Sequence, residues 1–137
     1  MNDAELFSAV SSEIIELHIG FERWFCGDGP EHLDRVEAVL APEFSMVAPN
    51  GIPVQRSEVM ANLENARGLH QIRIEIASQN LVWHSADAVL AGYDEIQHHA
   101  SFTTRRRSTG LFSREDTAPN GLVWRHVHET WIEPPPD

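Results

Sequence analysis

Two stretches in the second half of the chain carry side chains that could do acid–base chemistry. Residues 93–97 read Tyr-Asp-Glu-Ile-Gln, and in a strand Tyr93, Glu95 and Gln97 share one face because successive side chains alternate. Residues 122–132 read Leu-Val-Trp-Arg-His-Val-His-Glu-Thr-Trp-Ile. The same alternation predicts one face with aromatic, imidazole and hydroxyl groups: Trp124, His126, His128 and Thr130. If both faces line one cavity, it contains a phenol, a carboxylate and one or two imidazoles.

These groups suit general acid–base catalysis. His128 or Glu95 could accept a proton, and the Tyr93 hydroxyl could donate a hydrogen bond to a developing oxyanion. We therefore predict these three residues as catalytic. The predicted ligand-binding residues are Trp124, His126, Thr130, Gln97 and Arg107. A structural interpretation stays open, in which Tyr93 belongs to the core, Glu95 pairs with Arg107, and His128 bonds across the sheet.

Histidine pairs and an arginine run are the other notable polar patterns. His126-Val-His128 and His98-His99 could hold zinc only if a third ligand converged on them. The sequence offers no close cysteine or acidic cluster for that role, so we predict no metal and no cofactor. The run Arg105-Arg106-Arg107 fits a solvated face paired with Glu129 or Glu133, or a carboxylate clamp made by Arg105 or Arg107.

The composition limits the class of partner and the compartment. The 137 residues carry a formal net charge of −11, and nucleic acid or an anionic membrane would require a basic surface instead. Cys26 is the only cysteine, which excludes an internal disulfide and favours the reducing cytoplasm. The first residues lack the pattern of a signal peptide, and no apolar run approaches the ~20 residues of a membrane span.

Hydrophobic spacing predicts three helices, at residues 3–26, 31–41 and 58–67. The first has apolar residues recurring every three or four positions, as listed here: Leu6, Val10, Ile14, Leu17 and Phe21. The second ends before Pro42, and Ser57 is the expected N-cap of the third.

The remaining segments alternate with the period of strands. A short pair at 44–48 and 52–54 contains Pro53, so we expect it at a sheet edge or outside the main sheet. Four longer strands follow: 72–83, 86–97, 101–114 and 121–132. The phase of the first of these breaks at residues 78–80, which suggests a β-bulge that would curve the sheet.

Helices followed by a strand meander predict an α+β fold. The expected architecture is a cone, with three N-terminal helices packed in the concave face of a curved antiparallel sheet. We expect one domain over residues 1–137, with residues 133–137 as a proline-rich tail.

The order of motifs resembles the nuclear transport factor 2-like superfamily, with its cystatin-like fold. The resemblance rests on four segments: 26–36, 40–44, 49–54 and 124–131. That superfamily includes ketosteroid isomerase, small polyketide cyclases, dehydratases and the association domain of a calmodulin-dependent kinase. The isomerase places a catalytic aspartate near the turn that resembles 49–54, where this chain has Ala48, Pro49, Asn50 and Gly51, so that mechanism is not implied.

Two functions are therefore expected for the cone. The first is binding of a small, partly apolar molecule, with a cofactor-independent isomerase, cyclase or dehydratase reaction as one form of it. The second is a non-catalytic interaction or assembly module. The resemblance also implies a homodimer through the outer sheet face, where Val123, Val127 and Trp131 form an apolar patch that would be covered.

Overall fold

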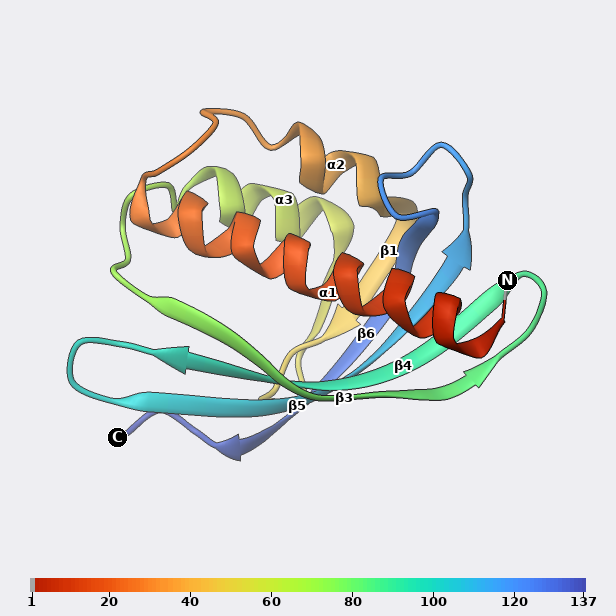
Figure 1. Cartoon of the computed structure of the whole chain (residues 1–137). Helices are drawn as coiled ribbons and strands as arrows, with labels where there is room; N and C mark the ends of the chain where they lie inside the picture. The colour runs from red at the N-terminus through yellow and green to blue at the C-terminus, as the bar shows by residue number, and fades with distance from the viewer. Residues whose placement is uncertain (1) are drawn as a thin grey trace.

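The longest element is helix α1 (Asp3–Cys26), and it lies across a curved sheet in the computed structural model, which describes residues 2–137 (Figure 1). The predicted bounds of this helix are confirmed. The Asn2 side chain accepts a hydrogen bond from the backbone N–H of Glu5 at 2.8 Å and caps the first turn. Gly27 ends the helix in the left-handed conformation with φ 80°.

The two shorter helices differ from prediction at their ends. Helix α2 (Asp34–Val39) is only 6 residues long because the chain becomes extended at Leu40, before Pro42. Helix α3 (Arg56–Glu64) starts earlier than expected, since Gln55 rather than Ser57 is the N-cap. Gln55 and Glu58 form a capping box, which satisfies two backbone donors of the first turn.

Six strands in residues 2–137 form one sheet in the order β2-β1-β6-β5-β4-β3. Their bounds are β1 (Leu40–Val47), β2 (Pro53–Gln55), β3 (Arg73–His84), β4 (Ala88–His98), β5 (Thr103–Arg114) and β6 (Leu122–Glu133). The last four form the expected antiparallel meander. The sheet is mixed rather than wholly antiparallel because β1 pairs with β6 in parallel. The short strand β2 with Pro53 lies at the edge, as predicted.

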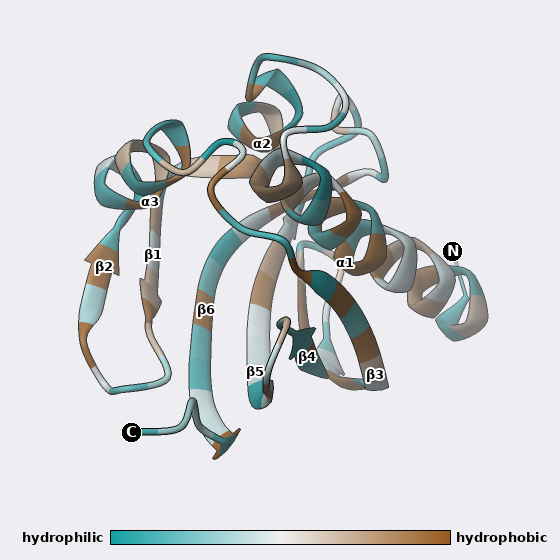
Figure 2. Cartoon of the chain, turned by 90° about the vertical axis from the view of Figure 1, so that its left-hand side faces the viewer, coloured by the Kyte–Doolittle hydropathy of each residue, from teal (hydrophilic) through white to brown (hydrophobic). Residues whose placement is uncertain are grey.

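Irregularities in two long strands accompany the curvature of the sheet below the helices (Figure 2). The register of β3 against β4 shifts between Ala77 and Asn80, and Ser78 has φ 55°. This confirms the predicted bulge. A second shift lies in β6, where Trp124 and His126 oppose consecutive residues of β5 and Arg125 is the extra residue. Extra residues of this kind bend a strand and increase its twist.

The core joins the inner face of α1 to the concave side of the sheet. Its fully buried members include Leu6, Val10, Ile14, Val89, Phe112 and Trp124. Glu13 is also buried and accepts hydrogen bonds from Trp124 Nε1 at 2.9 Å and from Arg35 Nη2 at 2.9 Å. Asn120 Nδ2 donates to the same carboxylate at 3.1 Å. This one side chain therefore ties α1 to α2, to β6 and to the loop before β6.

Within residues 2–137, no helix combines the length and the apolar character needed to cross a membrane.

Candidate functional site

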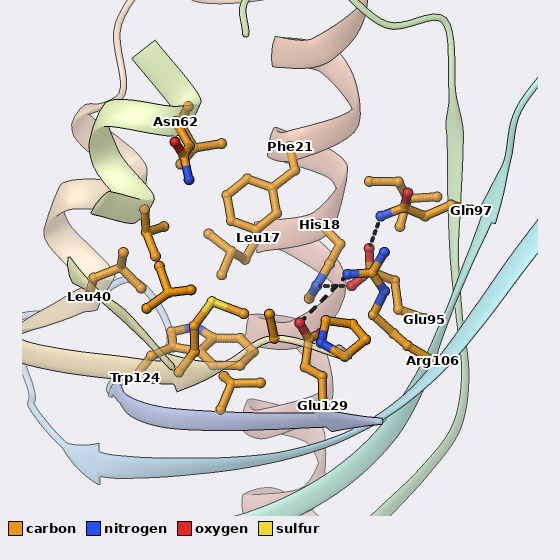
Figure 3. A pocket seen from close by; sticks show the side chains of 18 of the residues that line it. Leu17, His18, Phe21, Leu40, Asn62, Glu95, Gln97, Arg106, Trp124 and Glu129 are labelled. Atoms are coloured by element: carbon orange, nitrogen blue, oxygen red, sulfur yellow. Dashed lines mark hydrogen bonds and ion pairs between the residues drawn. The ribbon is translucent and has the colours of Figure 1, made fainter. Parts of the chain in front are cut away.

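A cavity of about 370 Å³ lies between the helices and the concave face of the sheet. Most of its wall is apolar and comes from α1, α3, β1 and neighbouring segments: Leu17, Phe21, Phe25, Phe44, Met46 and Val59. Asn62 lies apart on α3, and the other charged or amide side chains gather at one end, as Figure 3 shows: His18, Glu95, Gln97, Arg106 and Glu129. An apolar pocket with a few convergent polar groups is the usual form of a small-molecule site.

A buried ion pair between His18 and Glu95 is the centre of this polar end. His18 Nε2 lies 3.2 Å from Glu95 Oε1, and the two side chains are 5% and 7% exposed. The other ring nitrogen, Nδ1, lies 2.7 Å from the carbonyl oxygen of Ile14. Both nitrogens thus face acceptors, and only the doubly protonated imidazolium can donate to both.

The electrostatics of the pair agree with that assignment. Burial opposes the charged form of His18, but the charge of Glu95 and the hydrogen bonds to Glu95 and Ile14 raise the pKa of His18 above its usual value. Burial likewise opposes ionisation of Glu95, yet the charge and hydrogen bond of His18 lower the pKa of Glu95 to about 2. Gln97 Nε2 donates to the second carboxylate oxygen of Glu95 at 2.7 Å.

The second carboxylate, Glu129, has a different environment. Its Oε2 accepts a hydrogen bond from Ser108 Oγ at 3.1 Å, and its Oε1 lies 3.6 Å from Arg106 Nη1. Burial and the negative charge of Glu95 raise the pKa of Glu129. The two carboxylates therefore differ in role: Glu95 is held ionised, and Glu129 binds a proton more readily.

Tyr93 completes the wall beside the ion pair. Its ring centroid is 5.5 Å from that of His18 and 6.2 Å from that of Trp124, in edge-on contacts. Burial and the charges of Glu129 and Glu95 raise the pKa of Tyr93 well above 10. Its hydroxyl stays protonated at neutral pH and is available as a hydrogen-bond donor.

Some of the residues that the sequence predicted for the site line the cavity, and others do not. Tyr93, Glu95, Gln97 and Trp124 line the cavity. The prediction that His126, His128 and Thr130 share the wall of Trp124 is wrong, because the extra residue in β6 reverses the alternation after Trp124. Past that point Val127 and Glu129 face inward. His128 and Thr130 are exposed on the convex face.

The arginine run is also distributed differently from the prediction. Arg107 does not line the cavity; its Nε and Nη2 donate to Asp94 at 3.0 and 3.2 Å. Arg105 Nε donates to the same carboxylate at 2.9 Å. Arg106, whose side chain points to the other face, enters the cavity and approaches Glu129. Arg105 and Arg107 are thus held by an aspartate of the sheet.

The prediction of an apolar patch on the outer face must also be corrected, because the extra residue in β6 exchanges the faces of the residues that follow it. Val127 is buried and lines the cavity. Trp131 is paired with Arg106 in the sheet register, and the guanidinium lies 4.8 Å from its ring centroid. Trp131 is therefore on the face that carries Arg106, not on the convex face.

Four polar residues of the cavity were not predicted from the sequence: His18, Asn62, Arg106 and Glu129. His18 carried a usable signal, because it lies within the apolar face of the first helix, next to Leu17 and four residues after Ile14. A polar side chain at such a position must find a buried partner. Arg106 and Glu129 carried no comparable signal, since their faces depend on the strand register.

Comparisons with solved structures support the fold. An NTF2-like protein of unknown function from Pseudomonas aeruginosa has a TM-score of 0.84 and 32% sequence identity, covering 90% of this chain and 98% of that one. The CaMKII hub of S. rosetta has a TM-score of 0.73 at 14% identity, covering 91% and 95%. The expected nuclear transport factor 2-like, cystatin-like fold is confirmed.

Comparisons with sequences point to a more specific relationship. Sucrose-phosphatase 1 of Nicotiana tabacum is 24% identical over 143 residues, which cover 97% of this chain and 33% of the relative. Sucrose-phosphatase 2 of the same plant is 26% identical over 129 residues. The chain spans about a third of the length of these curated relatives. The family model for the sucrose-6-phosphate phosphohydrolase C-terminal region matches residues 10–133, and the chain belongs to that family.

Proposed function

We propose that this protein binds a small, partly apolar molecule in its cone and performs general acid–base chemistry on it without a cofactor, as an isomerase, cyclase or dehydratase. The observation that carries the proposal is the buried ion pair of His18 and Glu95 at the end of an apolar cavity. Burying two charges costs several kcal/mol per ion in desolvation, so such a pair is weak evidence of a purely stabilising role. Perturbed titratable groups in a cavity favour a functional site.

The proposed roles follow from the protonation of each group. His18 is the acid, since both of its ring nitrogens face acceptors, which favours the doubly protonated ring, and its pKa is raised. Glu129 is the proton acceptor, because its raised pKa makes it a better base than Glu95. The Tyr93 hydroxyl would donate to a developing oxyanion. Glu95 positions His18 and keeps it charged.

Binding can be tested with an uncharged aromatic probe, 3-phenylpropan-1-ol, titrated into the isotope-labelled protein and followed by NMR. The expected shifts cluster at the cavity, including the indole N–H of Trp124. Val127→Phe should abolish binding because Val127 is 5% exposed and lines the cavity, where a phenyl ring would occupy the space. The matched control is His128→Ala on the convex face, which should bind normally.

Two outcomes would contradict the proposal. The first is binding that is unchanged in a folded Val127→Phe variant, since the probe would then lie elsewhere. The second is loss of binding in His128→Ala with an unchanged melting temperature, since that residue lies outside the cavity.

A second candidate function is an assembly or interaction module. The support is that the relatives include hub and association domains of CaMKII and a region of sucrose-phosphatases. On this hypothesis the chain forms a homodimer through the convex face of the sheet. Leu111 is the test position there, because it is half-buried and pairs with His126 in the register.

The assembly hypothesis is tested by light scattering coupled to size exclusion. Leu111→Glu should convert dimers to monomers, whereas Leu69→Glu, at a residue 68% exposed before β3, should not. A monomeric wild-type protein, or a dimer that survives Leu111→Glu, would refute this interface. Val127→Phe should leave the mass unchanged, which separates assembly from ligand binding.

The proposed location is the cytoplasm, and the proposed partner is a small molecule rather than nucleic acid or a membrane. The net charge of −11 opposes binding to anionic polymers and lipids. The single cysteine, Cys26, is half-buried, and its thiol donates to the carbonyl of Ile72 at 3.4 Å. A reduced, packed thiol is compatible with a reducing compartment.

A further inference from the structure

In the part of the chain that the structure describes, Arg106 is a cavity residue with an unpaired hydrogen-bond donor. Its side chain is 17% exposed, and the nearest carboxylate oxygen, on Glu129, lies 3.6 Å from Nη1. That distance is too long for a hydrogen bond. Its Nε is buried and has no hydrogen-bond partner among residues 2–137. A buried, unpaired guanidinium N–H is costly, so it calls for a missing acceptor.

The neighbouring carboxylates do not supply that acceptor. Glu95 is already engaged on both oxygens, by His18 at 3.2 Å and by Gln97 at 2.7 Å. Glu129 accepts a hydrogen bond from Ser108 through Oε2, and its Oε1 stays 3.6 Å from Arg106 Nη1. Neither carboxylate at the polar end therefore lies within hydrogen-bond distance of Arg106 Nη1 in the way that Glu95 lies near His18.

We propose that the ligand of this cavity carries a carboxylate, bound by the guanidinium of Arg106, and an apolar body packed along Leu17, Phe21 and Met46. This inference rests on the proposed ligand-binding function and specifies its ligand class. A carboxylate offers two acceptors in the geometry that suits the fork of an arginine. Its oxygens would accept hydrogen bonds from guanidinium N–H groups of Arg106, which Glu129 approaches no closer than 3.6 Å.

A cationic ligand is the opposite possibility, and the arrangement disfavours it. An ammonium group could reach Glu129, but it would also meet Arg106 and the charged ring of His18. Glu95 could accept it only by giving up the hydrogen bonds to His18 and Gln97. A neutral ligand could accept a hydrogen bond from Arg106 but would not form the stronger, charge-assisted bonds of a carboxylate.

The test compares three probes that share one apolar body: 3-phenylpropanoate, 3-phenylpropan-1-ol and 3-phenylpropylamine. Their affinities for the full chain are measured at pH 7 by isothermal titration calorimetry, and NMR shifts locate each probe. We expect the carboxylate to bind at least tenfold tighter than the alcohol. Arg106→Gln should remove that preference and leave the affinity for the alcohol within about twofold, since only the charge-assisted bonds are lost. Arg106→Lys should retain part of the preference for the carboxylate over the alcohol.

Arg107→Gln is the matched control, because the adjacent arginine binds Asp94 and lies outside the cavity. It should preserve the tenfold preference. Equal affinity for carboxylate and alcohol, or tightest binding of the amine, in the wild-type protein would overturn the carboxylate inference while the proposed cavity function stands. If none of the three probes shifts the signals of the cavity residues, the proposed function itself fails.

Discussion

Replacing Glu95 with glutamine should reverse the sign of the pH-dependent contribution that His18 makes to the free energy of unfolding. At 3.2 Å, the attraction between the two charges is about 5 kcal/mol with an effective dielectric constant of ~20. Part of this offsets the desolvation of both groups. Removing one partner of a buried pair leaves the other charge without compensation and costs about 3–5 kcal/mol. We therefore expect Glu95→Gln to lower the free energy of unfolding by about 3 kcal/mol at pH 6.

The sign of the pH effect follows from the direction of the pKa shift. In the wild-type protein the folded-state pKa of His18 is raised above 6.5. Its contribution to stability is fully present below the unfolded pKa of about 6.5 and is lost as the pH rises through the folded value. In Glu95→Gln, burial dominates and lowers the pKa of His18. The contribution then becomes destabilising as the pH falls below about 6.5.

Urea unfolding between pH 5 and 9 measures the difference in stability between variant and wild type, and NMR of the His18 ring gives its pKa directly. Glu75→Gln is the matched control, since Glu75 pairs with His98 at 2.9 Å but its side chain is 47% exposed. That variant should change little, because exposed pairs are screened by water. The reasoning is refuted if Glu95→Gln leaves the pKa of His18 at or above its wild-type value.

Three further perturbations test the fold around the cavity. Glu13→Ala should cost about 3 kcal/mol in urea unfolding, because it removes the buried acceptor of Trp124 Nε1. The hydrogen bond from Arg107 lowers the pKa of Asp94. The Asp94 carboxylate therefore stabilises the fold above its unfolded pKa, and this contribution is lost as the pH falls through the folded pKa. In Asp94→Asn, the free energy of unfolding should depend less steeply on pH at acidic pH. Gly110→Ala should lower the melting temperature, since its Cβ would lie 3.3 Å from the Trp124 ring.

Much of the fold could be predicted because local patterns decide it. The apolar spacing in residues 3–26 and the glycine after Cys26 define α1, and the structure reproduces both ends. Alternation predicted the four long strands, and a break in phase at 78–80 predicted the bulge of β3. These features depend on the chain within a few residues of each position, so they can be read without knowledge of the tertiary contacts.

The parallel pairing of β1 with β6 could not be predicted in the same way. The two strands are about 80 residues apart in the chain, as the Ser45–His126 pairing shows. Which strand lies beside β6 depends on how the helices and the meander pack together, and not on the residues of β1 alone.

The sequence by itself determined that the chain has an amphipathic first helix, a curved meander and a set of acid–base side chains on its strands. Only the tertiary structure decided which of those side chains share the cavity. One extra residue, Arg125, turns His128 outward and Glu129 inward, and the packing of α1 brings His18 within 3.2 Å of Glu95. The physical reason is that side chains alternate along a strand, so a shift of one residue exchanges its two faces.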